Sequence, residues 1–262
     1  MTDASTDHPD GVSGDSPLVR CTIAGGVATI TLDSPANRNA LSRRLLADLH
    51  EALDAAATAR AIVVTHSGPT FCAGADLKER SAGPTDATPM ALAMQRLMEA
   101  PQPTIAALHG AARAGGIGVL AACDLVVAHP GVTFAFTEVR IGVAPAIISV
   151  PILRRAPWSR IAAAFLTGET FTAHDALRMD LITHVTEDVA GQVQRLTDAV
   201  VAAAPNAVAV TKTLLRSAAA HQLRDDFAAM RELSESLFGS TEAAEGMRAF
   251  AERRPPDWSQ LD

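Results

Sequence analysis

Positive charge is scarce in this sequence. The 262 residues include 22 Lys and Arg against 29 Asp and Glu, which gives a net charge of −7. This balance argues against a nucleic-acid binder that depends on a broad basic surface. Charged residues make up 19% of the chain and hydrophobic residues 48%, so the chain as a whole is not disordered. Its length suits one large domain, or one domain with an appendage, and is ample for a buried core.

Cysteine and long apolar runs are also in short supply. Cys21, Cys72 and Cys123 are odd in number and lack the spacing of a metal site. We therefore expect small buried side chains in a reducing cytosol rather than a disulfide framework. The longest apolar stretch, residues 114–136, is interrupted by an aspartate, a histidine and a proline, so it is not expected to span a membrane.

Several catalytic and targeting motifs are missing. The eight histidines form no H-x-x-x-H pair and the acidic residues do not cluster, so no metal site is expected. Neither G-x-S-x-G nor a phosphate-binding loop is present, which leaves a serine hydrolase and a nucleoside triphosphatase without support. The first 17 residues are polar and acidic with no apolar stretch. We predict that 1–17 is a disordered tail rather than a signal peptide, and that the protein is cytoplasmic.

Strand-like runs alternate with helical stretches over much of the chain. The expected strands are 18–24, 27–33, 61–66, 104–108 and 124–128, and the expected helices are 42–58, 90–99 and 116–122. The first two strands are joined by Gly25-Gly26, which is typical of a hairpin. The alternation that follows predicts an α/β fold with largely parallel pairing. Strands nearly stop after Pro145, and three helices rich in Ala, Leu, Met and Glu are expected between Pro205 and Glu252.

Two stretches, residues 71–79 and 109–118, share a design of strand, small-residue turn and helix. Small residues let a ligand approach the backbone closely, and a helix start leaves unpaired N–H groups facing it. Two such turns facing each other would supply the converging donors that an oxyanion on an acyl thioester requires. For each turn taken alone, tight helix–sheet packing is the alternative interpretation.

The second turn also fits a dinucleotide-binding fingerprint. Residues 116–121 match G-x-G-x-x-A, and Glu138 lies 20 residues after Gly118, as that fingerprint prefers. The acid of the fingerprint should end the strand that follows the helix, but here a strand, a Pro-Gly pair and residues 134–136 intervene. This interpretation also leaves the first turn without a role.

Glu138 is the candidate acid or base. It lies within the apolar stretch 133–139, where desolvation is expected to raise its pKa toward the range useful for proton transfer. A salt bridge to Arg140 or another arginine is the structural alternative. Arg113, beside the second turn, either faces a charged group of a substrate or is a structural arginine.

Five blocks, in this order and spacing, resemble the crotonase (enoyl-CoA hydratase/isomerase) superfamily. They are residues 34–41, 71–79, 109–124, 134–145 and 245–255. The resemblance extends from about Leu18 to the C-terminus. It implies a crotonase-like spiral of ββα units over 18–204, an α-helical C-terminal oligomerisation region over 205–262, and assembly as homotrimers or dimers of trimers. It also implies an acyl-CoA thioester substrate, without a separate cofactor because coenzyme A is part of that substrate, and without a nucleic-acid or membrane partner.

The resemblance also assigns roles to residues. It implies an oxyanion hole formed by the N–H groups of Ala75 and Gly115, and it matches Glu138 to the acid that exchanges a proton with the carbon next to the thioester carbonyl. The implied coenzyme A contacts are the backbone around Ala73, Asp76 and Leu77 for the adenine, and Arg38, Lys78 and, from a neighbouring subunit, Arg253 for the phosphates.

The chain departs from two-glutamate hydratases at Gly118, where those enzymes carry a second acid. One glutamate suffices for hydration if water is held beside it, because it can donate its own proton and recover one from the water. Hydration of the 2,3 double bond of an enoyl-CoA is therefore the expected reaction. The alternatives are a Δ3,Δ2-enoyl-CoA isomerase, which needs one base and no water, and an acyl-CoA binder with little or no catalysis. Residues 138–149 look like crotonases of methylglutaconyl-type substrates, and 81–97 and 145–155 are expected to line the acyl pocket.

Overall fold

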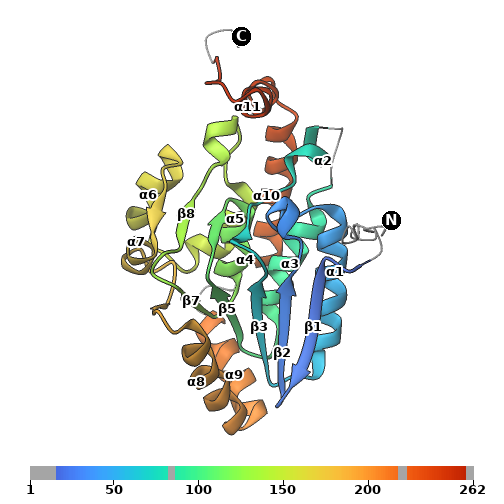
Figure 1. Ribbon diagram of the computed structural model, residues 1–262, viewed down its shortest axis with the longest axis vertical. Helices are drawn as coiled ribbons and strands as arrows, with labels where there is room; N and C mark the ends of the chain where they lie inside the picture. Colours follow the sequence, from blue (N-terminus) through green and yellow to red (C-terminus); the bar gives the residue numbers. More distant parts are fainter. Residues whose placement is uncertain (1–15, 82–85, 218–222, 258–262) are drawn as a thin grey trace, which may run out of the picture.

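The structure is a computed structural model that describes residues 16–81, 86–217 and 223–257. Its larger sheet contains β1 (Val19–Ala24), β2 (Val27–Leu32), β3 (Ala61–His66), β5 (Thr104–Leu108), β7 (Leu125–Ala128) and β10 (His184–Val185), in the order β1-β2-β3-β5-β7-β10. Only β1 and β2 pair antiparallel, and each later pair is parallel. Figure 1 shows this sheet with α1 (Arg43–Ala55) beside β1.

A smaller sheet stands beside the first. It contains β4 (Thr70–Cys72), β6 (Ala111–Arg113), β8 (Thr133–Ala135) and β9 (Phe171–Thr172) in that order. The pairs β4–β6 and β6–β8 are parallel, whereas β8–β9 is antiparallel. In the successive pairs β3–β4, β5–β6 and β7–β8, the first strand joins the larger sheet and the second joins the smaller one. With a helix after each pair, this is the predicted spiral of ββα units.

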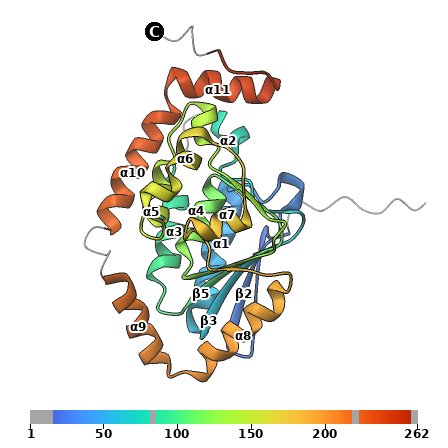
Figure 2. The ribbon, with the colours of Figure 1, turned by 90° about the vertical axis from the view of Figure 1, so that its left-hand side faces the viewer.

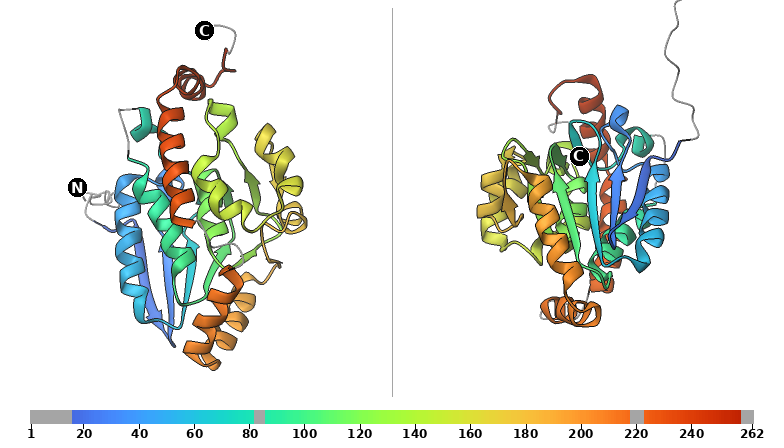
Figure 3. Two further views of the ribbon diagram at one scale, coloured as in Figure 1. Left: turned by 180° about the vertical axis from the view of Figure 1, so that it is seen from behind. Right: turned by 60° about the horizontal axis from the view of Figure 1, so that its bottom comes forward.

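The helices follow the strands in chain order. They are η1 (Pro35–Asn37), α1 (Arg43–Ala55), η2 (Ala56–Thr58), α2 (Leu77–Ser81), α3 (Thr88–Glu99), α4 (Gly115–Ala122), η3 (Glu138–Ile141), α5 (Ala146–Leu153), α6 (Trp158–Thr167), α7 (Ala173–Arg178), α8 (Val189–Ala202), α9 (Pro205–Ser217), α10 (Leu223–Phe238) and α11 (Thr241–Glu252). Figure 2 shows α9, α10 and α11 following one side of the molecule, with α11 lying across one end. Seen from behind, α10 runs beside α3 and α5 (Figure 3).

Local sequence accounts for the first elements. Gly25 and Gly26 both have positive φ angles, 57° and 80°, which the tight turn between β1 and β2 requires and glycine adopts freely. Ser42 begins α1 because its side-chain oxygen accepts a hydrogen bond from the Leu45 N–H, 3.2 Å away, which satisfies one orphan donor of the first turn. The apolar face of α1 is buried against β1 and β2. The hairpin and this helix confirm the sequence predictions.

The C-terminal helices are tied to the core by a buried ion pair. The Lys212 Nζ atom of α9 lies 2.8 Å from the Asp124 Oδ2 atom, at the junction of α4 and β7. Lys212 also donates to the carbonyl oxygens of Leu97 and Gln102, and the Arg216 guanidinium group reaches the other oxygen of Asp124. The three predicted C-terminal helices are therefore present and docked on the core. The division at residue 205 and a role of these helices in oligomerisation stay predictions.

Other expectations concern single residues and the chain ends. Cys72 and Cys123 are buried and Cys21 is partly buried, and all three are unpaired, as predicted. Burial raises the pKa of the Cys72 thiol to about 12, so that thiol is not a nucleophile near neutral pH. Of the predicted tail, residues 1–15 lie outside the described residues. Within the described ranges, no helix combines the length and apolar character needed to cross a membrane.

Candidate active site

Three consecutive strands of the smaller sheet end at one place. β4, β6 and β8 run parallel, so their carboxyl ends meet at the same edge of the sheet. The segment after β4 contains Ala73 and Ala75, the segment after β6 contains Ala114 and Gly115, and the segment after β8 contains Glu138. The topology therefore gathers the two predicted small-residue turns and the candidate acid, although they are far apart in the sequence.

The first turn is held by backbone contacts on both sides. The Ala73 N–H donates to the Arg38 carbonyl oxygen at 3.0 Å, and the Leu41 N–H donates to the Gly74 carbonyl oxygen at 2.8 Å. Gly74 has a φ of 90°, which favours glycine. In the described part of the chain, the Ala75 N–H has no hydrogen-bond acceptor. The turn thus presents one unpaired donor.

The second turn has an unusual backbone at Ala114. This alanine has a φ of 46° and a ψ of −122°, a combination that L-residues rarely adopt. It is held there because its N–H donates to the Ala135 carbonyl oxygen at 3.1 Å and its carbonyl oxygen accepts from Ile117 at 2.8 Å. The next residue, Gly115, begins α4, and its N–H has no acceptor among the described residues, as expected at a helix start.

The two turns touch. A Cβ atom on Gly74 would lie 2.8 Å from the Ala114 Cβ atom and 3.2 Å from the Gly115 nitrogen atom. There is no room for a side chain at Gly74, and this is the close approach that brings the second turn against the first. The geometry therefore favours facing turns over two independent packing turns.

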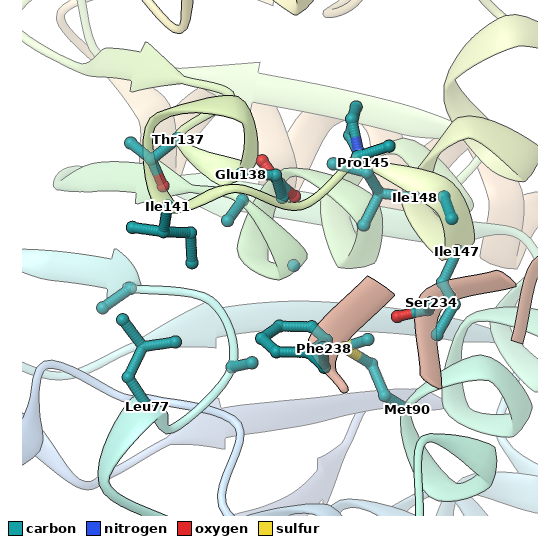
Figure 4. A pocket seen from close by; sticks show the side chains of 16 residues that line it. Leu77, Met90, Thr137, Glu138, Ile141, Pro145, Ile147, Ile148, Ser234 and Phe238 are labelled. Atoms are coloured by element: carbon teal, nitrogen blue, oxygen red, sulfur yellow. The ribbon is translucent and has the colours of Figure 1, made fainter. Parts of the chain in front are cut away.

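A pocket of about 530 Å³, partly open to solvent, lies where the turns and Glu138 meet. It is lined by Ala73, Ala75, Leu77, Met90, Ala114, Gly115, Thr137, Glu138, Ile141, Ala144, Pro145, Ala146, Ile147, Ile148, Ser234 and Phe238. Figure 4 shows the labelled side chains around this space, with Glu138 on one side and Ser234 and Phe238 on another. Of the two stretches expected to line an acyl pocket, 81–97 contributes one of these residues and 145–155 contributes four.

Glu138 is a buried acid with an unused oxygen. The residue is 9% exposed, and no described residue hydrogen-bonds its Oε2 atom. Burial among apolar side chains raises its pKa to about 7, and its own backbone N–H opposes this shift. The carboxyl group can therefore gain or lose a proton near neutral pH, which suits a general acid or base.

Both arginines considered beside the site have structural partners. Arg140 donates through Nε to the Thr167 carbonyl oxygen at 3.2 Å, and no described residue forms an ion pair with Glu138. The salt-bridge interpretation of Glu138 is therefore wrong. Arg113 donates to the carbonyl oxygen and to the hydroxyl group of Thr133, at 2.5 and 2.9 Å. It joins β6 to β8 and does not line the pocket, so the substrate-facing role considered for it is wrong.

Gly118 lies inside α4, one turn after Gly115, and its surroundings are full. A Cβ atom there would lie 2.5 Å from the Met94 Cε atom and 2.6 Å from the Ile148 Cγ2 atom. Because α4 begins at Gly115, Gly116 and Gly118 are helical residues rather than a loop. A dinucleotide fingerprint needs these glycines in the turn before the helix, so that interpretation is wrong.

The predicted coenzyme A contacts divide into two groups. Ala73 and Leu77 line the pocket, whereas Asp76 immediately precedes α2, and its Oδ1 atom accepts the Lys78 N–H at 2.9 Å. Arg38 and Lys78 are exposed. The last predicted contact, Arg253, is also exposed and ends α11. These three exposed cations and Asp76 do not line the pocket.

Sequence reasoning missed the contribution of α10. Ser234 and Phe238 line the pocket from this helix, and the Arg80 guanidinium group of α2 lies over the Phe238 ring, 4.5 Å from its centroid. This cation–π contact joins α2 to α10. The amphipathic pattern of α10 gives no sign of which core residues it meets, so nothing local in the sequence distinguishes these two residues.

Comparisons with known proteins agree with this arrangement. A family model described as enoyl-CoA hydratase/isomerase matches residues 22–261. A Thermus thermophilus protein named provisionally as an enoyl-CoA hydratase is 33% identical over 245 residues, which are 88% of this chain and 97% of that protein. A crystal structure of an enoyl-CoA hydratase from Mycobacterium avium is 41% identical, with a TM-score of 0.85, and the match covers 93% of this chain and 100% of that one.

A further match shows that the fold serves more than one reaction. A methylmalonyl-CoA decarboxylase in complex with 2-nitronate-propionyl-CoA is 26% identical, with a TM-score of 0.81 over 93% of this chain and 98% of that one. The reaction must therefore be argued from the residues of the pocket. The family model, the relatives and the fold together show that the chain belongs to the enoyl-CoA hydratase/isomerase family of the crotonase superfamily.

Proposed function

We propose that this enzyme is an enoyl-CoA hydratase that works with a single carboxyl group, that of Glu138. The observation that carries the proposal is the unpartnered, buried Oε2 atom of Glu138 in a pocket that two unpaired backbone N–H groups also line. The proposed substrate is a 2-enoyl thioester of coenzyme A. No separate cofactor is proposed, because coenzyme A is part of that substrate. Family membership supports a coenzyme A thioester.

The N–H groups of Ala75 and Gly115 are proposed to bind the thioester oxygen. Both residues line the pocket, both donors lack an intramolecular acceptor within the described ranges, and the two turns are in contact. Negative charge develops on the thioester oxygen when water adds to the double bond. Preorganised donors at that oxygen stabilise the developing charge, and one donor is worth about 10²–10³ in rate.

Glu138 is proposed to handle both protons. In its protonated form it donates a proton to the carbon next to the carbonyl, while the oxygen of a water molecule bonds to the next carbon. That water returns one proton to the carboxylate, so the carboxyl group is regenerated in each turnover. A pKa near 7 keeps both protonation states accessible at neutral pH.

Coenzyme A is proposed to follow the first turn. Ala73 and Leu77 line the pocket, and Asp76 precedes Leu77 in the same segment. The exposed cations Arg38 and Lys78 are expected to meet phosphates outside the pocket. In a homotrimer or in a dimer of trimers, Arg253 would reach a phosphate of the coenzyme A that is bound to a neighbouring subunit.

A Δ3,Δ2-enoyl-CoA isomerase is the second candidate, because a specific observation favours it. The position of the second acid of two-glutamate hydratases, Gly118, is closed by Met94 and Ile148. Moving a proton between two carbons needs one base and no water, which a one-acid pocket provides. An acyl-CoA binder without efficient catalysis would also keep the pocket but would not need an acid with a raised pKa.

The test is to incubate the purified protein with trans-2-crotonyl-CoA and to follow enoyl absorbance and product mass. We expect a mass gain of one water, which Glu138→Gln abolishes and Glu232→Gln, an exposed change on α10, leaves intact. If Glu138→Gln keeps most of the turnover, the assignment is wrong. If the protein converts a 3-enoyl-CoA to its 2-enoyl isomer and adds no water to crotonyl-CoA, it is the isomerase instead.

A further inference from the structure

The hydroxyl group of Ser234 lines the pocket and has no assigned role. Among the described residues that line the pocket, only Thr137, Glu138 and Ser234 have polar side chains. Ser234 as a residue is 6% exposed, and its hydroxyl group forms no hydrogen bond with a described residue. Its oxygen atom is not among the buried atoms without a partner, because it faces the pocket. A ligand that fills the pocket would remove this hydroxyl group from water, which is unfavourable unless the ligand supplies a hydrogen-bond partner.

Other helical hydroxyl groups in this protein behave differently. Thr167 donates to the carbonyl oxygen of Ala163 at 2.8 Å, and Thr213 donates to that of Ala209 at 3.0 Å. Both are bonds to the carbonyl four residues earlier, the usual way to satisfy such a group within a helix. Ser234 lies in α10 and makes no bond of this kind. Its hydroxyl oxygen points into the pocket in Figure 4.

Ser234 lies away from the reacting groups. In Figure 4 it lies across the pocket from Glu138, beside Ile147 and near Met90 and Phe238. Glu138 and the two turns that contain Ala75 and Gly115 come from segments that follow strands of the smaller sheet, whereas Ser234 comes from α10. With the thioester carbonyl at the turns, this part of the pocket receives the acyl chain beyond the double bond.

The charge of the pocket narrows the ligand chemistry. No Lys, Arg or His is among the described lining residues, and Glu138 adds negative charge when it ionises. A terminal carboxylate buried here would lack a counter-ion and would be costly. A hydroxyl or keto oxygen needs only one hydrogen-bond partner, and Ser234 provides it.

We propose that Ser234 is a specificity-determining residue whose hydroxyl group hydrogen-bonds an uncharged oxygen, a hydroxyl or keto group, on the acyl chain of the coenzyme A thioester. This inference rests on the proposed function for the orientation of the substrate. It separates the enzyme from crotonases of dicarboxylic acyl chains, including the methylglutaconyl-type substrates that residues 138–149 suggested.

The experiment compares trans-2-hexenoyl-CoA with the same substrate hydroxylated at C4, C5 or C6, and with trans-2,3-dehydroadipyl-CoA, which ends in a carboxylate. We expect the protein to prefer one hydroxylated substrate and to disfavour the carboxylate. Ser234→Ala is expected to lower kcat/KM about tenfold for the preferred hydroxylated substrate, and to change it less than about twofold for hexenoyl-CoA. Ser236→Ala, at an exposed position of the same helix, is the matched control, and Ser234→Thr should restore the preference.

Two results of this comparison would overturn the proposed role of Ser234. An equal loss on hexenoyl-CoA and on every hydroxylated substrate would overturn the proposal, because Ser234 would then support the reaction or the fold in general. No loss on any of them would overturn it as well. Binding of saturated hexanoyl-CoA and hydroxyhexanoyl-CoAs, measured by calorimetry, needs no turnover. A hydroxyl preference lost in Ser234→Ala would thus support the inference even if the hydratase assignment failed.

Discussion

The Cγ2 atom of Ile148 lies 2.6 Å from the point where a Cβ atom on Gly118 would stand, and the Cβ atom of Ile148 lies 3.0 Å from it. Met94 approaches the same point with its flexible end, but the branched side chain of Ile148 on α5 cannot move aside as easily. The pocket is therefore built around one acid, because the space for a second one is occupied by apolar side chains.

Gly118→Ala tests this packing. Replacing a helical glycine by alanine normally stabilises a protein by about 1 kcal/mol, but here the added methyl group overlaps Ile148. We expect a loss of about 2 kcal/mol instead, measured by urea denaturation. The penalty should shrink in an Ile148→Ala background, since the two changes share one contact. A stabilising Gly118→Ala in the parent protein would show that the space is open.

Glu138→Gln is expected to stabilise the protein at high pH. The folded pKa of about 7 exceeds the ordinary value of 4.5, so the folded state binds the proton more tightly than the unfolded state does. That contribution to stability is fully present below pH 4.5 and is lost as the pH rises through 7. The gap of about 2.5 pKa units corresponds to about 3 kcal/mol. The free energy of unfolding of Glu138→Gln, relative to the parent protein, should therefore rise by most of that amount, about 2.5 kcal/mol, between pH 5 and pH 8. An equal difference at both pH values would mean that Glu138 is not buried in its charged form.

Ala114 and Gly74 form a second test of the site. Ala114 adopts a backbone conformation that favours glycine, and such strain costs about 1–3 kcal/mol. We expect Ala114→Gly to stabilise the protein by about 1 kcal/mol after the entropy of glycine is subtracted. Gly74→Ala should do the opposite, because φ is 90° and the new methyl group would lie 2.8 Å from that of Ala114. Thermal denaturation of the two variants measures both signs, and stabilisation by both would refute the described turn.

Lys212 tests the docking of the C-terminal helices. Its side chain is 7% exposed and pairs with Asp124, so Lys212→Met leaves a carboxylate with one cation fewer. We expect a loss of about 2–3 kcal/mol in the free energy of unfolding. The control is Arg43→Met, which removes an exposed pair with Glu79 at 3.7 Å and should cost less than about 1 kcal/mol. Equal effects of the two changes would show that Lys212 is not buried in solution.

Sequence patterns predicted the elements whose signals are local. The β1–β2 hairpin has a glycine pair and α1 has a serine cap, and both begin within a residue of their predicted starts. The predicted helix over 42–58 is divided, because α1 ends at Ala55 and the last three residues form η2. The two small-residue turns were visible for the same reason, because each is a continuous run of Ala and Gly. The apolar stretch around Glu138 likewise predicted its burial.

The rest depends on contacts between distant segments. β4, β6 and β8 have three residues each, which is too short for a period-two pattern to be recognised. The partner of Arg113 is Thr133, which pairing of β6 with β8 brings close, and no spacing rule gives that pairing. Ser234 belongs to a helix whose apolar face could cover any part of the core. Its place in the pocket follows only from the packing of α10 on α3 and α5.

The pH dependence of turnover distinguishes the two proposed reactions. Hydration begins with protonated Glu138, which donates to the carbon next to the carbonyl, so the rate should fall as the pH rises through about 7. Isomerisation of a 3-enoyl-CoA begins with the carboxylate, which removes a proton from that carbon, so its rate should rise over the same range. Both rates can be followed on the free enzyme as kcat/KM between pH 5.5 and pH 8.5. Glu232→Gln should leave the profile unchanged, because Glu232 is exposed on α10. A hydration rate that is flat across this range would mean that another group supplies the proton, and Glu138 would lose its role as the acid.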